Sequence, residues 1–156
     1  MRSLTPGDVD DLLARYKRAR ERRDVDAAME LYRADADLRP DPFGEHLVGD
    51  LAIRAYWNSL AAEQANVEFD SERGWASGST ALAAWHGAWT RRVDAGRVRA
   101  RGFMTFEVDS DGLVVRERHW TLERTVGTDA TFQAEPAPPG PDEPPAAGLD
   151  RPARGR

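Results

Sequence analysis

Hydrophobic residues recur at helical spacing in the first part of the chain. Thr5, Pro6 and Asp8 stand in the order of a helix cap, a first-turn proline and a capping acid. The apolar face that follows is Val9, Leu12, Leu13 and Tyr16. A second helix is predicted after Asp24, with Val25, Ala28, Met29 and Tyr32 on one face. A third is predicted after Gly49 and Asp50, with Ile53, Tyr56, Trp57 and Leu60 on one face.

From Val67 onward the hydrophobic period changes to two, which is typical of strands. Strands are predicted over residues 67–75, 82–92, 97–108 and 113–123, with turns at 94–96 and 109–112. Helices followed by a strand meander predict an α+β fold, in which three N-terminal helices pack on one face of a curved antiparallel sheet. The second strand is apolar on both faces at its centre, which predicts a homodimer that covers the outer face.

Composition divides the chain in two. The stretch after Phe132 holds seven of the ten prolines and no aromatic residue, so we predict a domain over residues 1–132 and a disordered tail over 133–156. The sequence contains no run of apolar residues long enough to span a membrane and no signal-peptide pattern at its start, which predicts a soluble cytoplasmic protein. A net charge of −5 argues against nucleic acid as a partner.

Several kinds of chemistry are not indicated. The chain has no cysteine, which removes disulfides and thiolate nucleophiles. Its three histidines have no metal-binding spacing, so we predict neither a metal nor a cofactor.

The segment RPDPFGE places Asp41 between Pro40 and Pro42. Each proline fixes its own φ and keeps the preceding residue out of the helical region. Such rigidity suits two uses: Asp41 can form a turn, or it can be an aimed carboxylate.

The order of Tyr16, Asp24, Tyr32, the DPFG motif at 41–44, Gly49 and the Tyr56-Trp57 pair resembles the first half of bacterial ketosteroid isomerases. More broadly, residues 1 to about 124 resemble the NTF2-like superfamily and its SnoaL-like polyketide cyclases. The resemblance implies a cone-shaped fold in which helices close one side of a bent sheet around a deep apolar pocket.

The resemblance also implies roles for individual residues. Asp41 falls where the isomerases keep their general base, Tyr16 where their oxyanion tyrosine lies, and Tyr32 where some members have a supporting tyrosine. The position of their second oxyanion donor is Met104 here. A thioether cannot donate a hydrogen bond, which favours chemistry other than the isomerases' own.

The last strand offers an alternative. Leu113, Val115, Glu117 and His119 share one face, so Glu117 and His119 point into the pocket unless a one-residue gap places Trp120 there instead. The first arrangement resembles the Asp/His acid–base pair of SnoaL-like cyclases, and a histidine beside a carboxylate can move protons at neutral pH. The candidate catalytic residues are Asp41, Tyr16 and His119. The candidate substrate-binding residues are Tyr32, Trp57, Met104, Phe106, Glu117 and Trp120.

Three functions are consistent with this sequence. The first is a cofactor-independent acid–base enzyme of isomerase, cyclase or dehydratase type, whose substrate is a small hydrophobic molecule such as a polyketide, terpenoid or steroid. The second is a non-catalytic module that binds a hydrophobic ligand in the same pocket. The third is a dimerisation domain.

Overall fold

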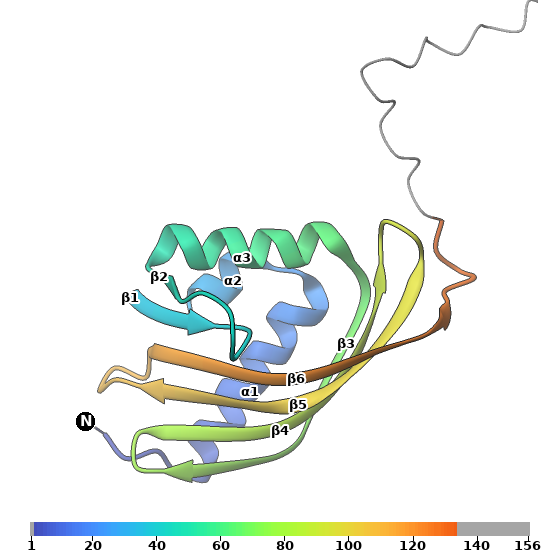
Figure 1. The fold of residues 1–156 in the computed structure, drawn as a ribbon. Coiled ribbons are helices and arrows are strands. Elements are labelled where there is room, and N and C mark those ends of the chain that lie inside the picture. The colour runs from blue at the N-terminus through green and yellow to red at the C-terminus, as the bar shows by residue number, and fades with distance from the viewer. Residues whose placement is uncertain (1, 134–156) are drawn as a thin grey trace, which may run out of the picture.

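The computed structural model describes residues 2–133, which form an α+β fold (Figure 1). Apart from Gln133, the predicted tail lies outside the described residues. The helices are α1 (Pro6–Arg22), α2 (Val25–Met29) and α3 (Asp50–Glu63). The strands are β1 (Tyr32–Arg39), β2 (Leu47–Val48), β3 (Gln64–Ser77), β4 (Thr80–Arg91), β5 (Gly96–Val108) and β6 (Val114–Thr128).

The strands form one curved, unclosed sheet in the order β2-β1-β6-β5-β4-β3. The β3 to β6 meander is antiparallel, as the sequence predicted. Strand β1 instead pairs in parallel with β6, where Leu38 lies opposite Glu117. This pairing places the chain between α2 and α3 directly beside the last strand, and the candidate site depends on it.

Helix α1 begins as its sequence predicts. The backbone N–H of Asp8 donates to Oγ1 of Thr5 at 3.2 Å, and the backbone N–H of Thr5 donates to Oδ2 of Asp8 at 2.8 Å, which completes a capping box. The predicted face of α1, including Val9, Leu13 and Tyr16, is buried. Side-chain capping therefore fixes where α1 begins, and apolar burial fixes which face meets the sheet.

The prediction for the chain after Asp24 was wrong in part. Asp24 does cap α2, since it accepts from the backbone N–H of Ala27 at 3.0 Å, but α2 ends at Met29. Tyr32, predicted on a helical face, is instead the first residue of β1. Strands β1 and β2 lie between α2 and α3, so the helices do not form one uninterrupted N-terminal block.

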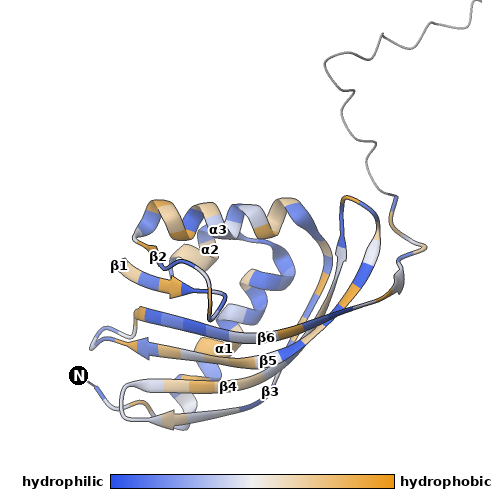
Figure 2. Cartoon of the chain, viewed as in Figure 1, coloured by the Kyte–Doolittle hydropathy of each residue, from blue (hydrophilic) through white to orange (hydrophobic). Residues whose placement is uncertain are grey.

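Close backbone approaches accompany the bend of the sheet. A Cβ on Gly102 would overlap the carbonyl oxygen of Trp120 on β6, and a Cβ on Gly87 would lie 2.7 Å from the carbonyl oxygen of Glu68 on β3. Only glycine permits neighbouring strands to approach this closely. Figure 2 shows hydrophobic and hydrophilic residues mixed along these strands, as expected for a sheet with one covered face.

The outer face of β5 carries the arginines that alternate along this strand. Arg97 pairs with Glu68 at 2.6 Å and Arg101 pairs with Glu72 at 2.9 Å, both on β3. These cross-sheet ion pairs neutralise the charge of the two arginines, so this face is a solvated surface rather than an anion site. None of the helices in the described part of the chain is long and apolar enough to cross a membrane.

Candidate active site

A buried polar cluster lies where β1, β6 and α3 meet. The hydroxyl of Tyr32 donates to Oε2 of Glu117 at 2.5 Å. It also accepts from Nε1 of Trp57 at 3.2 Å. Nε2 of His119 contacts the other carboxylate oxygen of Glu117. Glu117 is 1% exposed and His119 is 6% exposed, so this is an acid–base pair removed from bulk water.

Strand alternation explains how β6 supplies both members of the pair. Glu117 and His119 are two residues apart, so they point to the same, inner face of the sheet. The structure adopts the register without a gap, and Trp120 consequently points to the outer side, where it is 48% exposed. Tyr32 reaches the pair from the first position of β1, and Trp57 reaches it from α3.

The hydrogen bonds of the cluster indicate which groups donate and which accept. When Glu117 is ionised, its carboxylate only accepts hydrogen bonds, so the Tyr32 hydroxyl and Nε2 of His119 are then its donors. Burial, followed by the charge of Glu117, holds the pKa of Tyr32 well above its usual value near 10. Nδ1 is therefore the ring nitrogen of His119 that remains for a reacting molecule.

Tyr16 lies beside the same carboxylate within an aromatic shell. Its ring packs against Trp57, Phe69 and Phe106 at centroid distances of 5.5, 5.2 and 5.5 Å. Burial, followed by the charge of Glu117, raises the pKa of Tyr16 well above its ordinary range. Tyr16 thus remains a neutral hydroxyl, and the prediction that it is an oxyanion donor stays a prediction.

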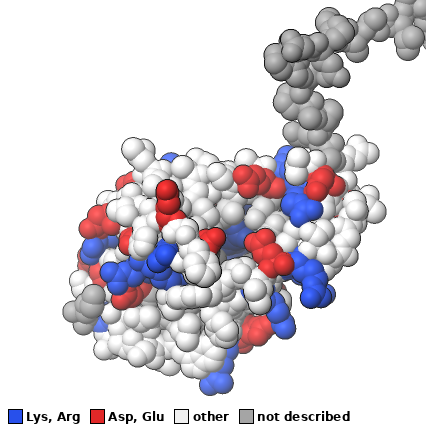
Figure 3. All heavy atoms as spheres, viewed as in Figure 1, with Lys and Arg blue, Asp and Glu red and all other residues white. Residues whose placement is uncertain are grey.

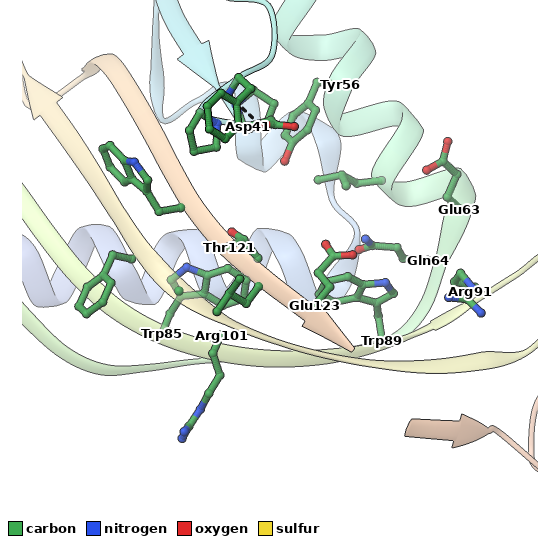
Figure 4. A pocket seen from close by; sticks show the side chains of 18 of the residues that line it. Asp41, Tyr56, Glu63, Gln64, Trp85, Trp89, Arg91, Arg101, Thr121 and Glu123 are labelled. Carbon is green, nitrogen blue, oxygen red and sulfur yellow. Dashed lines mark hydrogen bonds between the residues drawn. The ribbon is translucent and has the colours of Figure 1, made fainter. Parts of the chain in front are cut away.

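A large cavity of about 1560 Å³ opens beside this cluster. Figure 4 shows Tyr56 on the helix side of it and Trp85, Trp89 and Thr121 on the sheet side; Gln64, the first residue of β3, also belongs to the sheet. The hollow also reaches the outer side of the sheet, since Arg101, Phe103, Trp120 and Leu122 border it as well. Figure 3 shows acidic and basic side chains interspersed on this face of the molecule, which does not favour a ligand of one charge.

The sheet register relates the cavity to the buried cluster. Trp85, Gly102 and Thr121 form one cross-strand row and line the cavity. The next row on the inner face is Ala83, Met104 and His119, and the row after it ends in Glu117. Successive inner rows are about 7 Å apart along a strand. His119 therefore lies one row beyond the cavity floor, with Glu117 behind it.

Two polar atoms of the cavity wall have no partner. Among the described residues, the buried side-chain nitrogen and oxygen atoms without a hydrogen bond are Arg39 Nε, Gln64 Oε1 and Trp85 Nε1. Gln64 and Trp85 both line the cavity. An unpaired buried polar group is costly, typically about 1–3 kcal/mol, so each of these atoms needs an explanation.

Asp41 occupies a different environment from the one the resemblance implied. The residue is exposed, and its Oδ1 accepts from the backbone N–H of Phe43 at 2.8 Å, so it forms the turn of its own loop. It still borders the cavity together with Pro40, Pro42 and Phe43. The structure does not bring Asp41 into the buried cluster, and its role as general base stays a prediction.

The other predicted substrate-binding residues divide by location. Met104 and Phe106 are at most 1% exposed and belong to the core rows behind the cavity. Residues that the sequence analysis did not select, namely Tyr56, Gln64, Trp85 and Thr121, line the cavity instead. The five tryptophans of the chain are a sequence signal for Trp85, but no pattern selects the other three residues. Within the described residues, no three or more histidine, aspartate or glutamate side chains are grouped to hold a metal ion.

Comparison with known proteins identifies the family. The model of the SnoaL-like domain matches residues 13–117, more than half of the chain, so the protein belongs to the SnoaL-like family, as the sequence predicted. No match was found among curated proteins.

Solved structures with a similar fold include SalBIII, an epoxide hydrolase/cyclase-like enzyme of pyran ring formation in the polyether salinomycin. SalBIII is 21% identical, with a TM-score of 0.70 over 77% of this chain and 97% of that one. A protein described as a SnoaL-like polyketide cyclase from Shewanella denitrificans is 12% identical, with a TM-score of 0.65 over 75% and 91% of the two chains. A computationally designed 17-OHP binder is 17% identical, with a TM-score of 0.64 over 76% and 98%. These likenesses establish an NTF2-like fold.

Proposed function

We propose that this protein is a cofactor-independent acid–base enzyme of isomerase, cyclase or dehydratase type, which moves a proton on a small hydrophobic substrate bound in the cavity. The observation that carries the proposal is the His119–Glu117 pair, buried one row beyond an aromatic-lined cavity and held by Tyr32. Membership of the SnoaL-like family and a fold shared with a cyclase-like enzyme support the same class of reaction.

The contacts define what each residue does. His119 takes the substrate proton on Nδ1, because Nε2 is engaged with Glu117. The carboxylate of Glu117 stabilises the imidazolium that results, and the hydroxyl of Tyr32 fixes the carboxylate in position. The same imidazolium then returns the proton to a second atom of the substrate, so that the protein ends in its starting state.

A generic carbon acid tests the proposal without knowledge of the natural substrate. The compound 5-nitrobenzisoxazole is small and apolar; loss of its ring proton breaks the N–O bond and gives a coloured phenolate. We expect wild type to exceed free imidazole at equal concentration, and His119→Gln to lose about 100-fold or more of the rate. His86→Gln is the matched control, since His86 is an exposed histidine beside Glu72 on the outer face.

The variants separate the competing assignments. Retention of the wild-type rate by His119→Gln would refute the proposal. If only Asp41→Asn lost the rate, Asp41 rather than His119 would be the base. The pH–rate profile adds a second readout, because the ionisation of the base should disappear from the profile of the variant that removes the base and persist in the other variant.

The second candidate function is non-catalytic binding of a hydrophobic ligand. The unpaired atoms of Gln64 and Trp85 favour it, and a designed 17-OHP binder has a similar fold. A pure binder should show ligand affinity but no proton-transfer rate above that of His119→Gln. The homodimer and the cytoplasmic location stay predictions; exposed Phe103 and Leu122 on the outer side of the sheet support the former.

A further inference from the structure

The indole of Trp85 is a buried hydrogen-bond donor with nothing to donate to. Trp85 is 5% exposed, and the Nε1 atom of its indole has no hydrogen-bond partner among the described residues. Trp85 lines the cavity from the row next to that of His119. The unpaired donor is thus placed at the boundary between the cavity and the acid–base pair.

The orientation of this ring is fixed by its neighbours. Trp85 stacks on Phe69 at a centroid distance of 5.2 Å and an interplanar angle of 22°. A Cβ on Gly87 would lie 3.3 Å from Cζ3 and 3.7 Å from Cε3 of Trp85, so the benzo edge of the indole faces Gly87. Nε1 is on the opposite edge of the ring. It therefore points away from the row of Gly87, toward the row of Ala83, Met104 and His119.

We propose that Trp85 is a catalytic residue whose indole N–H donates a hydrogen bond to the substrate oxygen on which negative charge develops when His119 removes the proton. The inference rests on the proposed function for the identity of the base. A donor at Trp85 would also replace one that is missing. Met104, which lies opposite His119 at the position where the isomerases have their second oxyanion donor, has a thioether and cannot donate a hydrogen bond. The inference also defines the substrate class, namely an uncharged apolar molecule with a carbonyl, ether or similar acceptor oxygen next to the reacting carbon.

A second unpaired polar atom lies farther along the same sheet. Oε1 of Gln64 is a buried acceptor without a partner among the described residues, and Gln64 pairs with Arg91, six residues along β4 from Trp85. Six residues of extended strand span about 20 Å. A ligand that satisfies both atoms is thus elongated, with its acceptor oxygen at Trp85 and a hydroxyl or N–H group at Gln64.

Trp85→Phe tests the donor, because phenylalanine keeps an aromatic ring against Phe69 and removes only the N–H and part of the ring. With 5-nitrobenzisoxazole the charge develops on the phenolate oxygen, and we expect kcat to fall about tenfold with little change in KM. The loss should grow for the 5-chloro and unsubstituted benzisoxazoles, whose poorer leaving groups place more charge on that oxygen. A ring that only packs would lower all three rates equally. Trp75→Phe is the matched control, because Trp75 on β3 is partly exposed and lies outside the cavity lining.

Two further measurements test the role of Trp85 without assuming that His119 is the base. The thermal midpoint of Trp85→Phe should equal or exceed that of wild type, since the variant removes an unsatisfied N–H. Binding of the product phenolate, 2-cyano-4-nitrophenolate, should weaken about tenfold in Trp85→Phe and stay near wild type in Trp75→Phe. Equal product affinity in wild type and Trp85→Phe, or equal sensitivity to the leaving group, overturns the inference whether or not His119 proves to be the base. Loss of activity in His119→Gln with unchanged product binding separates the two proposals.

Discussion

The hydroxyl of Tyr32 is the best single place to test the buried cluster. It donates to Oε2 of Glu117 and accepts from Nε1 of Trp57, so Tyr32→Phe leaves two buried groups without their partner. A hydrogen bond to a charged group contributes about 1.5–3 kcal/mol, and an orphaned neutral N–H costs about 1–3 kcal/mol. We expect Tyr32→Phe to lower the free energy of unfolding by about 3 kcal/mol, allowing for partial relaxation.

Urea denaturation followed by tryptophan fluorescence measures this loss. With a slope of about 1.5 kcal/mol per molar urea for a domain of this size, the midpoint should fall by about 2 M. Tyr56→Phe is the matched control, because Tyr56 lies on α3 and borders the cavity, but its hydroxyl is not part of the Tyr32–Glu117 cluster. We expect that control to cost less than about 1 kcal/mol.

A double-mutant cycle identifies the partner. In the Glu117→Gln background the acceptor is neutral, so Tyr32→Phe should cost about 1 kcal/mol less than it does in the wild-type background. A loss within about 0.5 kcal/mol of wild type for Tyr32→Phe alone would show that the hydroxyl does not hold the carboxylate. An undiminished loss in the Glu117→Gln background would show that the charge of Glu117 adds nothing to this hydrogen bond.

Two further predictions concern the scaffold. Gly102→Ala should lower the free energy of unfolding by about 2 kcal/mol or more, because its Cβ overlaps the carbonyl oxygen of Trp120, whereas Gly7→Ala, with no atom nearer than 3.8 Å, should be neutral by the same denaturation assay. Hydrogen bonds from Thr131 and Thr90 hold the pKa of Asp129 well below its usual value near 4. A depressed folded-state pKa contributes stability that is present above the unfolded-state value and is lost as the pH falls, so Asp129→Asn should flatten the loss of stability measured below about pH 4. An unchanged acid limb in that variant would contradict the assignment.

The sequence predicted the elements whose signals are local. The cap at Thr5 and the face of α1 need only neighbouring residues, and the alternation of β5 and β6 is equally local. Strand β1 was missed because Tyr32 fits the helical spacing of Val25 and Ala28 as well as it fits a strand. The helical and the strand period both fit Tyr32, and its pairing with β6 makes it part of a strand.

The site depends on contacts that no local pattern contains. Tyr32 and Glu117 are 85 positions apart and meet only because β1 joins β6 in parallel. Alternation alone did place Glu117 and His119 on one face, and the structure has that register. The unpaired Nε1 of Trp85 was beyond prediction, since the lack of a partner within the described residues is a property of three-dimensional packing.

The cluster is better explained by chemistry than by stability. A buried carboxylate loses its hydration, and replacing buried ion pairs by apolar residues of similar volume is often neutral or stabilising. Asp41, in contrast, is exposed and accepts a hydrogen bond within its own turn, so its placement requires no burial of a charge. The polar groups whose burial costs free energy are Tyr32 on β1 and Glu117 and His119 on β6.

The triple variant Tyr32→Phe/Glu117→Met/His119→Met puts this reasoning to a test. It replaces three members of the cluster by apolar side chains of similar volume and leaves only Nε1 of Trp57 without a partner, so it should be more stable than Tyr32→Phe, which costs about 3 kcal/mol. The rate with 5-nitrobenzisoxazole should be lost completely. If the triple variant is instead less stable than Tyr32→Phe, the three polar residues are part of the structural core, and their burial is no argument for catalysis.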